Sequence, residues 1–214
     1  ELLDELSPEA QLIGAVNTVL NDNGKLIGYN TDGYGFMQSV RDAGHDITGK
    51  NITVMGVGGA SMAICAQSAL DGAASVHIFA RRTSRYWNRT QKFAENLSAK
   101  TGCQVCLFDN DDHTALRDSI AQSYLLINAT SVGMVPDIDD TIIKDTSLFH
   151  PELVVADVVY EPQETRLLRE AKAAGCQTFN GMYMLLHQGA KAFQIWTGQE
   201  MPVSVIKEKY FSVK

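Results

Sequence analysis

A short glycine-rich segment, VMGVGGAS at positions 54–61, could hold the phosphates of a nucleotide. It nearly matches the dinucleotide-binding pattern G-x-G-x-x-G, with Ser61 in the place of the third glycine. Gly56 would permit a tight turn, Gly58 would let the backbone approach a pyrophosphate, and Ser61 is small enough for close packing of helix on strand. The cofactor-binding residues of this loop would be Gly56, Gly58, Gly59, Ala60 and Ser61.

The flanking sequence decides between a nucleotide site and a tight turn that binds no ligand. A strand is expected before the loop, at 51–57, and a helix after it, at about 59–70, which is the order that the pattern requires. The N-terminus of such a helix offers unpaired N–H groups and the positive end of its dipole to phosphates. Nucleotide binding is therefore favoured.

The tip of the next expected strand, 75–80, indicates which dinucleotide would bind. An acidic residue about 20 residues beyond the glycines would bond the ribose 2′-hydroxyl of NAD. Residues 80–85 instead read ARRTSR and contain no carboxylate. Arg81 and Arg82 suit a 2′-phosphate, because guanidinium groups pair with phosphate oxygens. NADP is the predicted cofactor; the alternative is that both arginines lie on a solvated face.

These residues belong to a long alternation of strands and helices. Further strands are expected at 104–109, 124–130, 153–160 and 177–180, and further helices at about 84–99, 113–121 and 165–174. The strands are nearly continuous apolar runs, as expected when helices cover both faces of a sheet. Repeated strand–helix units predict an α/β fold with a Rossmann-type, doubly wound parallel sheet and right-handed crossovers.

The two ends of the chain do not follow this alternation. Strands are expected at 14–20 and 25–30 around the turn at 21–24, with a helix from Thr31 or Asp32 to about Ala43. The first ten residues read like the interior of a helix, so we expect a fragment that lacks its natural N-terminus. Helices are expected at about 182–196 and 203–212. Residues 1–31 with 182–214 would form the remnant of an α/β substrate-binding lobe, and 32–181 the nucleotide-binding lobe.

Composition excludes several classes of partner. The 214 residues carry a net charge of −7 and no basic stripe, so no nucleic-acid partner is expected. No run of 18 apolar residues is present, and no membrane partner is expected. The four cysteines include a C-x-x-C at Cys103 and Cys106, but no further ligands complete a metal site. Isolated thiols fit a reducing, cytoplasmic location. The sequence leaves a homodimer open.

Four further motifs occur along the chain: GAVNT (14–18), GYNTDGYG (28–35), NATSVGM (128–134) and GMYMLLHQGA (181–190). Together with the glycine loop, and in this order, they make the chain resemble the shikimate dehydrogenase family, and especially its quinate/shikimate branch. The resemblance extends over essentially the whole chain. It implies a substrate lobe and a nucleotide lobe, and reversible hydride transfer between the 3-hydroxyl of shikimate and NADP or NAD, a step in the synthesis of aromatic amino acids.

The resemblance also implies roles for single residues. Asp32 would be the catalytic aspartate and would contact the substrate; Asn17 and Gln188 would contact its hydroxyl groups, with Tyr160 near the ring. Such a polyol needs carboxylate and amide partners, and its oxidation needs a base within hydrogen-bond reach. The residues that the resemblance places beside the cofactor are Asn128, Thr130 and Gly181.

The chain also departs from the family. No lysine occupies the family's catalytic motif, which lies upstream of the residues matching Glu1, so this piece is expected to be nearly inactive although the parent protein is an enzyme. At the strand tip, where the family often has an asparagine, this chain has Ala80. The segment Asn88-Arg89-Thr90 resembles the family's motif, but it lies within the next expected helix and is not taken as that motif. Two rival functions stay open: a quinate/shikimate dehydrogenase that uses NAD or both cofactors, and a nucleotide-binding sensor without catalysis.

Overall fold

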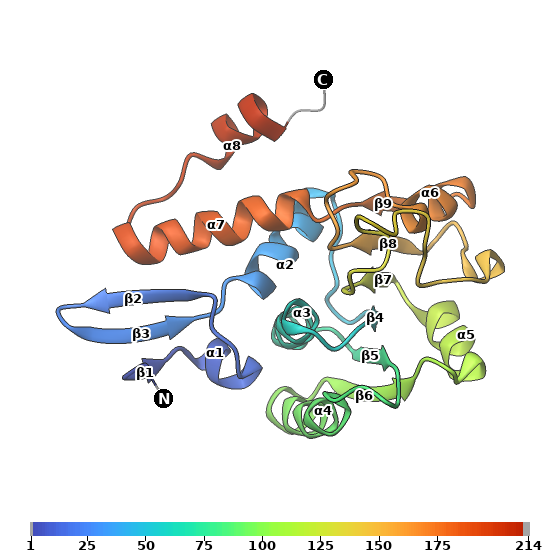
Figure 1. Cartoon of the computed structure of the whole chain (residues 1–214), viewed down its shortest axis with the longest axis horizontal. Helices are drawn as coiled ribbons and strands as arrows, with labels where there is room; N and C mark the ends of the chain where they lie inside the picture. The colour runs from blue at the N-terminus through green and yellow to red at the C-terminus, as the bar shows by residue number, and fades with distance from the viewer. Residues whose placement is uncertain (1, 212–214) are drawn as a thin grey trace.

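A computed structural model describes residues 2–211, and its larger sheet has six parallel strands (Figure 1). The strand order is β6-β5-β4-β7-β8-β9, so the chain runs outward from β4 in one direction and then returns to continue from β4 in the other. The strands are β4 (Asn51–Met55), β5 (Ser75–Ala80), β6 (Gln104–Asp109), β7 (Leu125–Asn128), β8 (Val154–Asp157) and β9 (Gln177–Phe179). This confirms the predicted doubly wound α/β fold.

Helices cover both faces of this sheet because its strands carry apolar side chains on both sides. Alternate residues of β7 show the division, since Leu125 and Ile127 belong to one buried cluster and Leu126 belongs to the other. The first cluster includes residues of α2 (Asp32–Asp42), α3 (Gly59–Leu70) and α4 (Trp87–Thr101). The second packs against α5 (His113–Gln122) and α6 (Arg166–Ala173). The predicted strand–helix alternation is thereby confirmed, with boundaries displaced by a few residues.

The N-terminal part forms a smaller sheet of three strands, β1 (Glu5–Leu6), β3 (Lys25–Tyr29) and β2 (Thr18–Asp22), in the order β1-β3-β2. The hairpin turn was predicted correctly: Asn23 and Gly24 have φ of 53° and 96°. The first ten residues were predicted wrongly as a continuous helix. They contain β1 and then the start of α1 (Pro8–Ile13), capped by Ser7 Oγ. The strand expected from residue 14 is also too long, because Gly14 ends α1 at φ 70°.

The C-terminal helix α7 (Met182–Thr197) lies along α2 and runs from the β9 end of the large sheet to the side of the small sheet (Figure 1). The two helices approach closely at Gly35, where a Cβ atom would lie 2.7 Å from the backbone nitrogen of Gln188. After α7 come α8 (Val203–Ile206) and a π-helical turn at Lys207–Phe211, whereas one continuous helix was expected; residue 212 lies outside the described part. A short 3₁₀ turn, η1 (Thr146–Leu148), precedes β8. The predicted division into lobes stays a prediction.

No described helix combines the length and apolar character needed to span a bilayer. Cys65, Cys103, Cys106 and Cys176 are all free thiols.

Candidate functional site

A cleft of about 1070 Å³ opens at the carboxyl ends of the parallel strands. It lies over the point where the strand order reverses, between β4 and β7, which is where open α/β sheets bind ligands. Its walls are the glycine loop (56–60), the β5 tip (79–81 and 83–86), residue 110 after β6, the segment after β7 (129–132, 134 and 142) and the segment after β8 (158–161).

The glycine loop has the conformation that its sequence predicts. Gly56 has φ 113°, and a Cβ there would lie 2.8 Å from Thr130 Cγ2 and 2.9 Å from the carbonyl oxygen of Ala129, so only glycine fits. A Cβ at Gly58 or Gly59 would meet nothing within 4 Å, which leaves the backbone at the start of α3 open to the cleft. Ala60 also lines the cleft.

Ser61 lies beneath the glycine loop and does not line the cleft. Its side chain is fully buried, and its Oγ donates a hydrogen bond to the carbonyl oxygen of Gly56 at 2.6 Å. The hydroxyl therefore ties the first turn of α3 back to the glycine that makes the bend. Ser61 was predicted to be a cofactor-binding residue. In the structure it would act indirectly, by holding in place the loop that would bind the cofactor.

The tip of β5 separates the two predicted arginines. Arg81 lines the cleft, whereas the guanidinium of Arg82 lies over the ring of Trp87, 4.6 Å from its centroid. Arg85, which the sequence analysis did not select, also lines the cleft and donates to the hydroxyl of Tyr86 at 2.6 Å. The sequence signal that could have identified Arg85 is its position four residues after Arg81, across a tight turn. A direct contact of Arg82 with the cofactor stays a prediction; in the structure its guanidinium lies over Trp87, the first residue of α4.

A buried network supports the cleft wall at the ends of β7 and β8. The side-chain oxygen of Asn128 accepts from the Thr130 hydroxyl at 2.6 Å and from the Thr130 N–H at 3.1 Å. Its amide nitrogen donates to Val132 O at 3.1 Å and to Asp157 Oδ1 at 3.0 Å. Asn128 is buried, and both its amide oxygen and its amide nitrogen already have hydrogen-bond partners. It therefore contributes to the cleft indirectly, by holding Thr130, which lines the cleft.

Asp157 is the carboxylate at the centre of this network, and the sequence analysis did not select it. Its Oδ1 also accepts from the backbone N–H of Val159 at 3.0 Å, and its Oδ2 accepts from the hydroxyl of Thr165 at 2.7 Å. Burial raises the pKa of Asp157 to about 6, although these hydrogen bonds favour the charged form. The carboxylate thus links β7, β8 and the N-terminal cap of α6 at a cost in desolvation.

We expect the variant Asp157→Asn to gain stability relative to the wild type as pH rises. The carboxyl group titrates at 3.8 in its ordinary environment and at about 6 in the fold, so the folded state binds more protons in that window and its stability falls as pH increases through it. The amide does not titrate, so the difference in unfolding free energy should grow by up to ~3 kcal/mol between pH 4 and pH 7. Urea unfolding at several pH values measures this, with the exposed Asp118→Asn as control. A difference that is constant with pH would contradict it.

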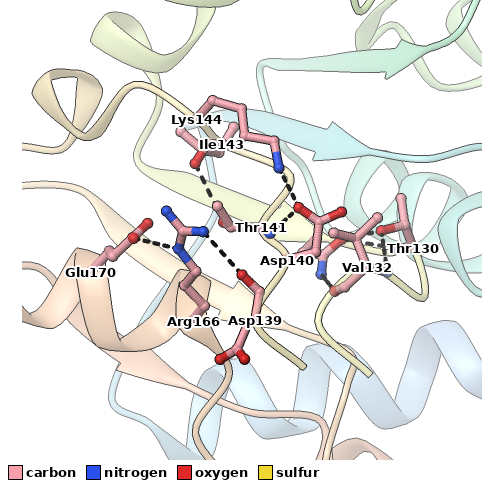
Figure 2. A network of polar contacts seen from close by, with 10 residues as sticks. Thr130, Val132, Asp139, Asp140, Thr141, Ile143, Lys144, Arg166 and Glu170 are labelled. Atoms are coloured by element: carbon pink, nitrogen blue, oxygen red, sulfur yellow. Dashed lines mark hydrogen bonds and ion pairs between the residues drawn. The ribbon is translucent and has the colours of Figure 1, made fainter. Parts of the chain in front are cut away.

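The long segment between β7 and β8 is fastened at several points. Figure 2 shows Arg166, at the start of α6, donating to the carbonyl oxygen of Asp139 at 3.0 Å and to Glu170 at 2.6 Å. Lys144 pairs with Asp140 in the same network. Because this segment supplies Thr130, Met134 and Ile142 to the cleft, these contacts hold one wall in place.

Three of the predicted substrate residues do come together, between the small sheet and α7. Asn17 Nδ2 donates to Asp32 Oδ1 at 2.8 Å and to Thr31 Oγ1 at 3.1 Å. The backbone N–H of Thr31 returns a bond to Asn17 Oδ1 at 3.0 Å, and its hydroxyl lies 3.4 Å from Gln188 Oε1. Asn17, Asp32 and Gln188, from three distant segments, thus meet around the buried Thr31, which the sequence analysis did not select.

Asp32 is arranged to accept a proton or a hydrogen bond. Burial raises the pKa of its carboxyl group, while the hydrogen bond from Asn17 acts in the opposite direction. Its Oδ2 accepts no hydrogen bond from any described residue, and no described lysine or arginine forms a salt bridge with Asp32. The next residue, Gly33, packs against α3, where a Cβ would lie 2.4 Å from the carbonyl oxygen of Ala63. The first turn of α2, which begins at Asp32, therefore packs on the helix whose N-terminus forms the glycine loop.

Tyr160 and Gly181 take different positions. Tyr160 is 43% exposed and lines the cleft after β8, on the same wall as Val158 and Val159. Gly181 is buried below that wall, where a Cβ would lie 2.0 Å from the carbonyl oxygen of Val158. Their predicted contacts with substrate and cofactor stay predictions; Gly181 would act through the position of the Val158 backbone.

Comparison with known proteins gives concordant matches. Residues 181–209 match the family model of the shikimate 5′-dehydrogenase C-terminal domain. A shikimate dehydrogenase (NADP(+)) of Listeria innocua is 53% identical over 209 residues, which are 98% of this chain and 72% of that protein. A quinate/shikimate dehydrogenase of Escherichia coli is 42% identical over 208 residues, 97% of this chain and 72% of that protein.

A solved structure agrees with these sequence matches. The shikimate 5-dehydrogenase of Listeria monocytogenes, in complex with shikimate and NAD, superposes on this chain with a TM-score of 0.92. The match is 52% identical and covers 96% of this chain and 71% of the Listeria chain. It therefore extends over both sheets described above.

Proposed function

This chain belongs to the shikimate dehydrogenase family, and we propose that it carries the cofactor-binding part and a portion of the polyol-binding part of an NADP-dependent shikimate dehydrogenase. The reaction is reversible hydride transfer that interconverts shikimate and 3-dehydroshikimate. The relatives are named as dehydrogenases, which favours an enzyme over the non-catalytic sensor weighed from the sequence.

The observation that carries this proposal is the open backbone at Gly58 and Gly59, next to a strand tip that has arginines and no carboxylate. The free N–H groups at the start of α3 suit a pyrophosphate. Arg81 and Arg85 line the same cleft, with the hydroxyls of Thr83 and Ser84 between them. Such a group of donors suits the 2′-phosphate of NADP, which a strand-tip carboxylate would repel.

The second half of the proposal concerns the substrate hydroxyl groups. NADP held in the cleft would supply the acceptor for the hydride of the alcohol carbon. The hydroxyl proton must leave at the same stage, and Asp32 Oδ2 is unoccupied and able to accept a hydrogen bond from that hydroxyl. Asn17 fixes the other carboxylate oxygen, and Gln188 offers an amide to a neighbouring hydroxyl.

We expect NADP⁺ to bind this chain at least tenfold more tightly than NAD⁺. Replacing Arg81 by Ala should weaken NADP⁺ binding by about 10- to 100-fold, because charge-assisted hydrogen bonds to the 2′-phosphate are lost. NAD⁺ binding should change by less than about threefold. Calorimetric titration of both dinucleotides measures this.

The adjacent Arg82→Ala is the matched control, because the Arg82 guanidinium lies over Trp87 and not in the cleft. It should leave the ratio of NADP⁺ to NAD⁺ affinity nearly unchanged. Equal affinities of the wild-type chain for the two dinucleotides would contradict the assignment of NADP. Failure of both to bind would overturn the proposed function.

The same samples, supplied with shikimate, report on catalysis. No described cation lies against Asp32, so we expect hydride transfer by this chain to be at least 100-fold slower than by the Listeria innocua relative, even with cofactor bound. Turnover at the rate of that relative would show that the described residues suffice. Quinate assayed in parallel tests the second candidate function, dual quinate and shikimate use, which the Escherichia coli relative favours.

A further inference from the structure

Asn110 is a polar residue on the wall of the cleft. It follows β6 directly, and its backbone N–H donates to the carbonyl oxygen of Ala80 at 2.9 Å. This bond fixes Asn110 beside the tip of β5, next to the residue that precedes Arg81. Like Arg81, it lines the cleft.

The side chain of Asn110 has no hydrogen-bond partner among the described residues. Its Oδ1 is buried and accepts no hydrogen bond, which is rare for a native amide oxygen. Nothing holds the carboxamide in one orientation, so rotation about its last side-chain bond exchanges oxygen and nitrogen at little cost. A carboxamide on the wall of a cleft without a protein partner is explained if a ligand supplies the missing donor.

The arrangement of the cleft indicates which part of a dinucleotide would reach Asn110. The phosphates belong at the glycine cradle, in the middle of the sheet edge. The reacting end belongs toward β7, β8 and α7, because α7 carries Gln188, which meets Asn17 and Asp32 around Thr31. The opposite end, over β5 and β6, is left for the adenosine, and Asn110 is the residue that β6 contributes there.

We propose that Asn110 recognises the adenine base of the cofactor by pairing its carboxamide with the edge of the purine. This inference rests on the proposed function. An asparagine side chain can accept from the exocyclic amine of adenine and donate to N7 beside it, whereas a purine with a carbonyl oxygen in place of the amine presents only acceptors at that edge and cannot match both groups. Rotation of the carboxamide toward the cleft would give the oxygen the donor that it lacks in the protein. The cofactor would then be recognised at its base as well as at its 2′-phosphate.

Nicotinamide hypoxanthine dinucleotide phosphate is the probe, because it replaces the adenine amine by a carbonyl oxygen and leaves N7, the ribose, the 2′-phosphate and the nicotinamide half unchanged; ring N1 gains a proton, on the edge away from N7. The wild-type chain should bind NADP⁺ about 10- to 100-fold more tightly than this analogue. Asn110→Ala should weaken NADP⁺ binding by a similar factor and bring the ratio of the two affinities close to one. Asn88→Ala, an exposed asparagine of α4 outside the cleft, should leave the ratio at its wild-type value.

Binding of the separate halves of the cofactor locates the effect. Adenosine 2′,5′-bisphosphate should bind Asn110→Ala more weakly than the wild type, while nicotinamide mononucleotide should bind both equally; thermal melting checks that the variant is folded. The inference is overturned, with the proposed function intact, if NADP⁺ binds but the adenine preference is absent or survives in Asn110→Ala. If the wild type binds no NADP⁺, the proposed function falls and this inference falls with it.

Discussion

Gly181→Ala is expected to lower the free energy of unfolding by about 3 kcal/mol or more, one of the largest effects that a single methyl group can have in this chain. The added Cβ would lie 2.0 Å from the carbonyl oxygen of Val158 and 2.6 Å from its carbonyl carbon. Both are backbone atoms of the segment that follows β8, so no side chain can rotate to make room. Gly181 has φ −74°, which any residue adopts, so the cost comes from the collision alone.

The matched control is Gly189→Ala in the middle of the same helix. A Cβ at Gly189 meets nothing within 4 Å, and alanine is a better helix former than glycine by about 1 kcal/mol. The two substitutions add a methyl group at the N-cap and in the middle of α7, and their effects on the free energy of unfolding, measured with urea, should have opposite signs. Similar stabilities for the two variants would contradict the close approach of α7 to β8.

The same contact connects stability to the site. The N–H of Gly181 donates to the carbonyl oxygen of Val159 at 3.2 Å, and Val158, Val159 and Tyr160 form one wall of the cleft. The position of α7, and with it Gln188, is therefore fixed relative to that wall by a contact that only glycine permits. A methyl group there would displace Gln188, and with it the contact to Thr31, relative to the cleft even if the chain still folded.

Most of the large sheet could be predicted from the sequence because its strands are apolar on both faces. The strands at 75–80 and 104–109 have the predicted boundaries, and α3 begins and ends where the glycine loop and its helix were expected. The small sheet was harder. β1 is only two residues long and exists because it pairs with β3, a long-range contact that no local pattern specifies. The start of α1 was signalled by Ser7 and Pro8 and was overlooked.

The candidate site was predictable in its residue types and less so in their orientation. Arg81 and Arg82 are adjacent and chemically identical, so the sequence does not distinguish them. In the structure, the contact of Arg82 with the ring of Trp87, at the start of α4, directs its side chain away from the cleft. Asn128 was predicted to lie beside the cofactor, but its hydrogen bonds with Thr130 and Asp157 leave it facing inward. Those partners lie on separate strands or turns, so the sequence could not reveal that the amide was already occupied.

Gly58→Val is expected to reduce NADP⁺ affinity by at least 100-fold while leaving the fold intact. Gly58 has φ −80° and ψ −177°, an extended conformation that valine adopts readily, and a Cβ there meets no atom within 4 Å. The loss of glycine at the N-cap of α3 should cost about 1 kcal/mol of stability. The isopropyl group, however, would fill the open space over the helix N-terminus, where the pyrophosphate must approach the backbone N–H groups.

The contrast with Gly56 makes this test specific. Valine at Gly56 would combine φ 113° with contacts of 2.8 Å and 2.9 Å to Thr130 and Ala129. Gly56→Val should therefore unfold the chain, so that its NADP⁺ affinity could not be measured. Titration of Gly58→Val with NADP⁺, beside thermal melting of the same sample, separates the two effects. Gly189→Ala should bind as the wild type does. If Gly58→Val melts normally and binds NADP⁺ with wild-type affinity, the cofactor phosphates do not lie on this loop, and the roles assigned to Arg81 and Asn110 at its flank would have to be abandoned with it.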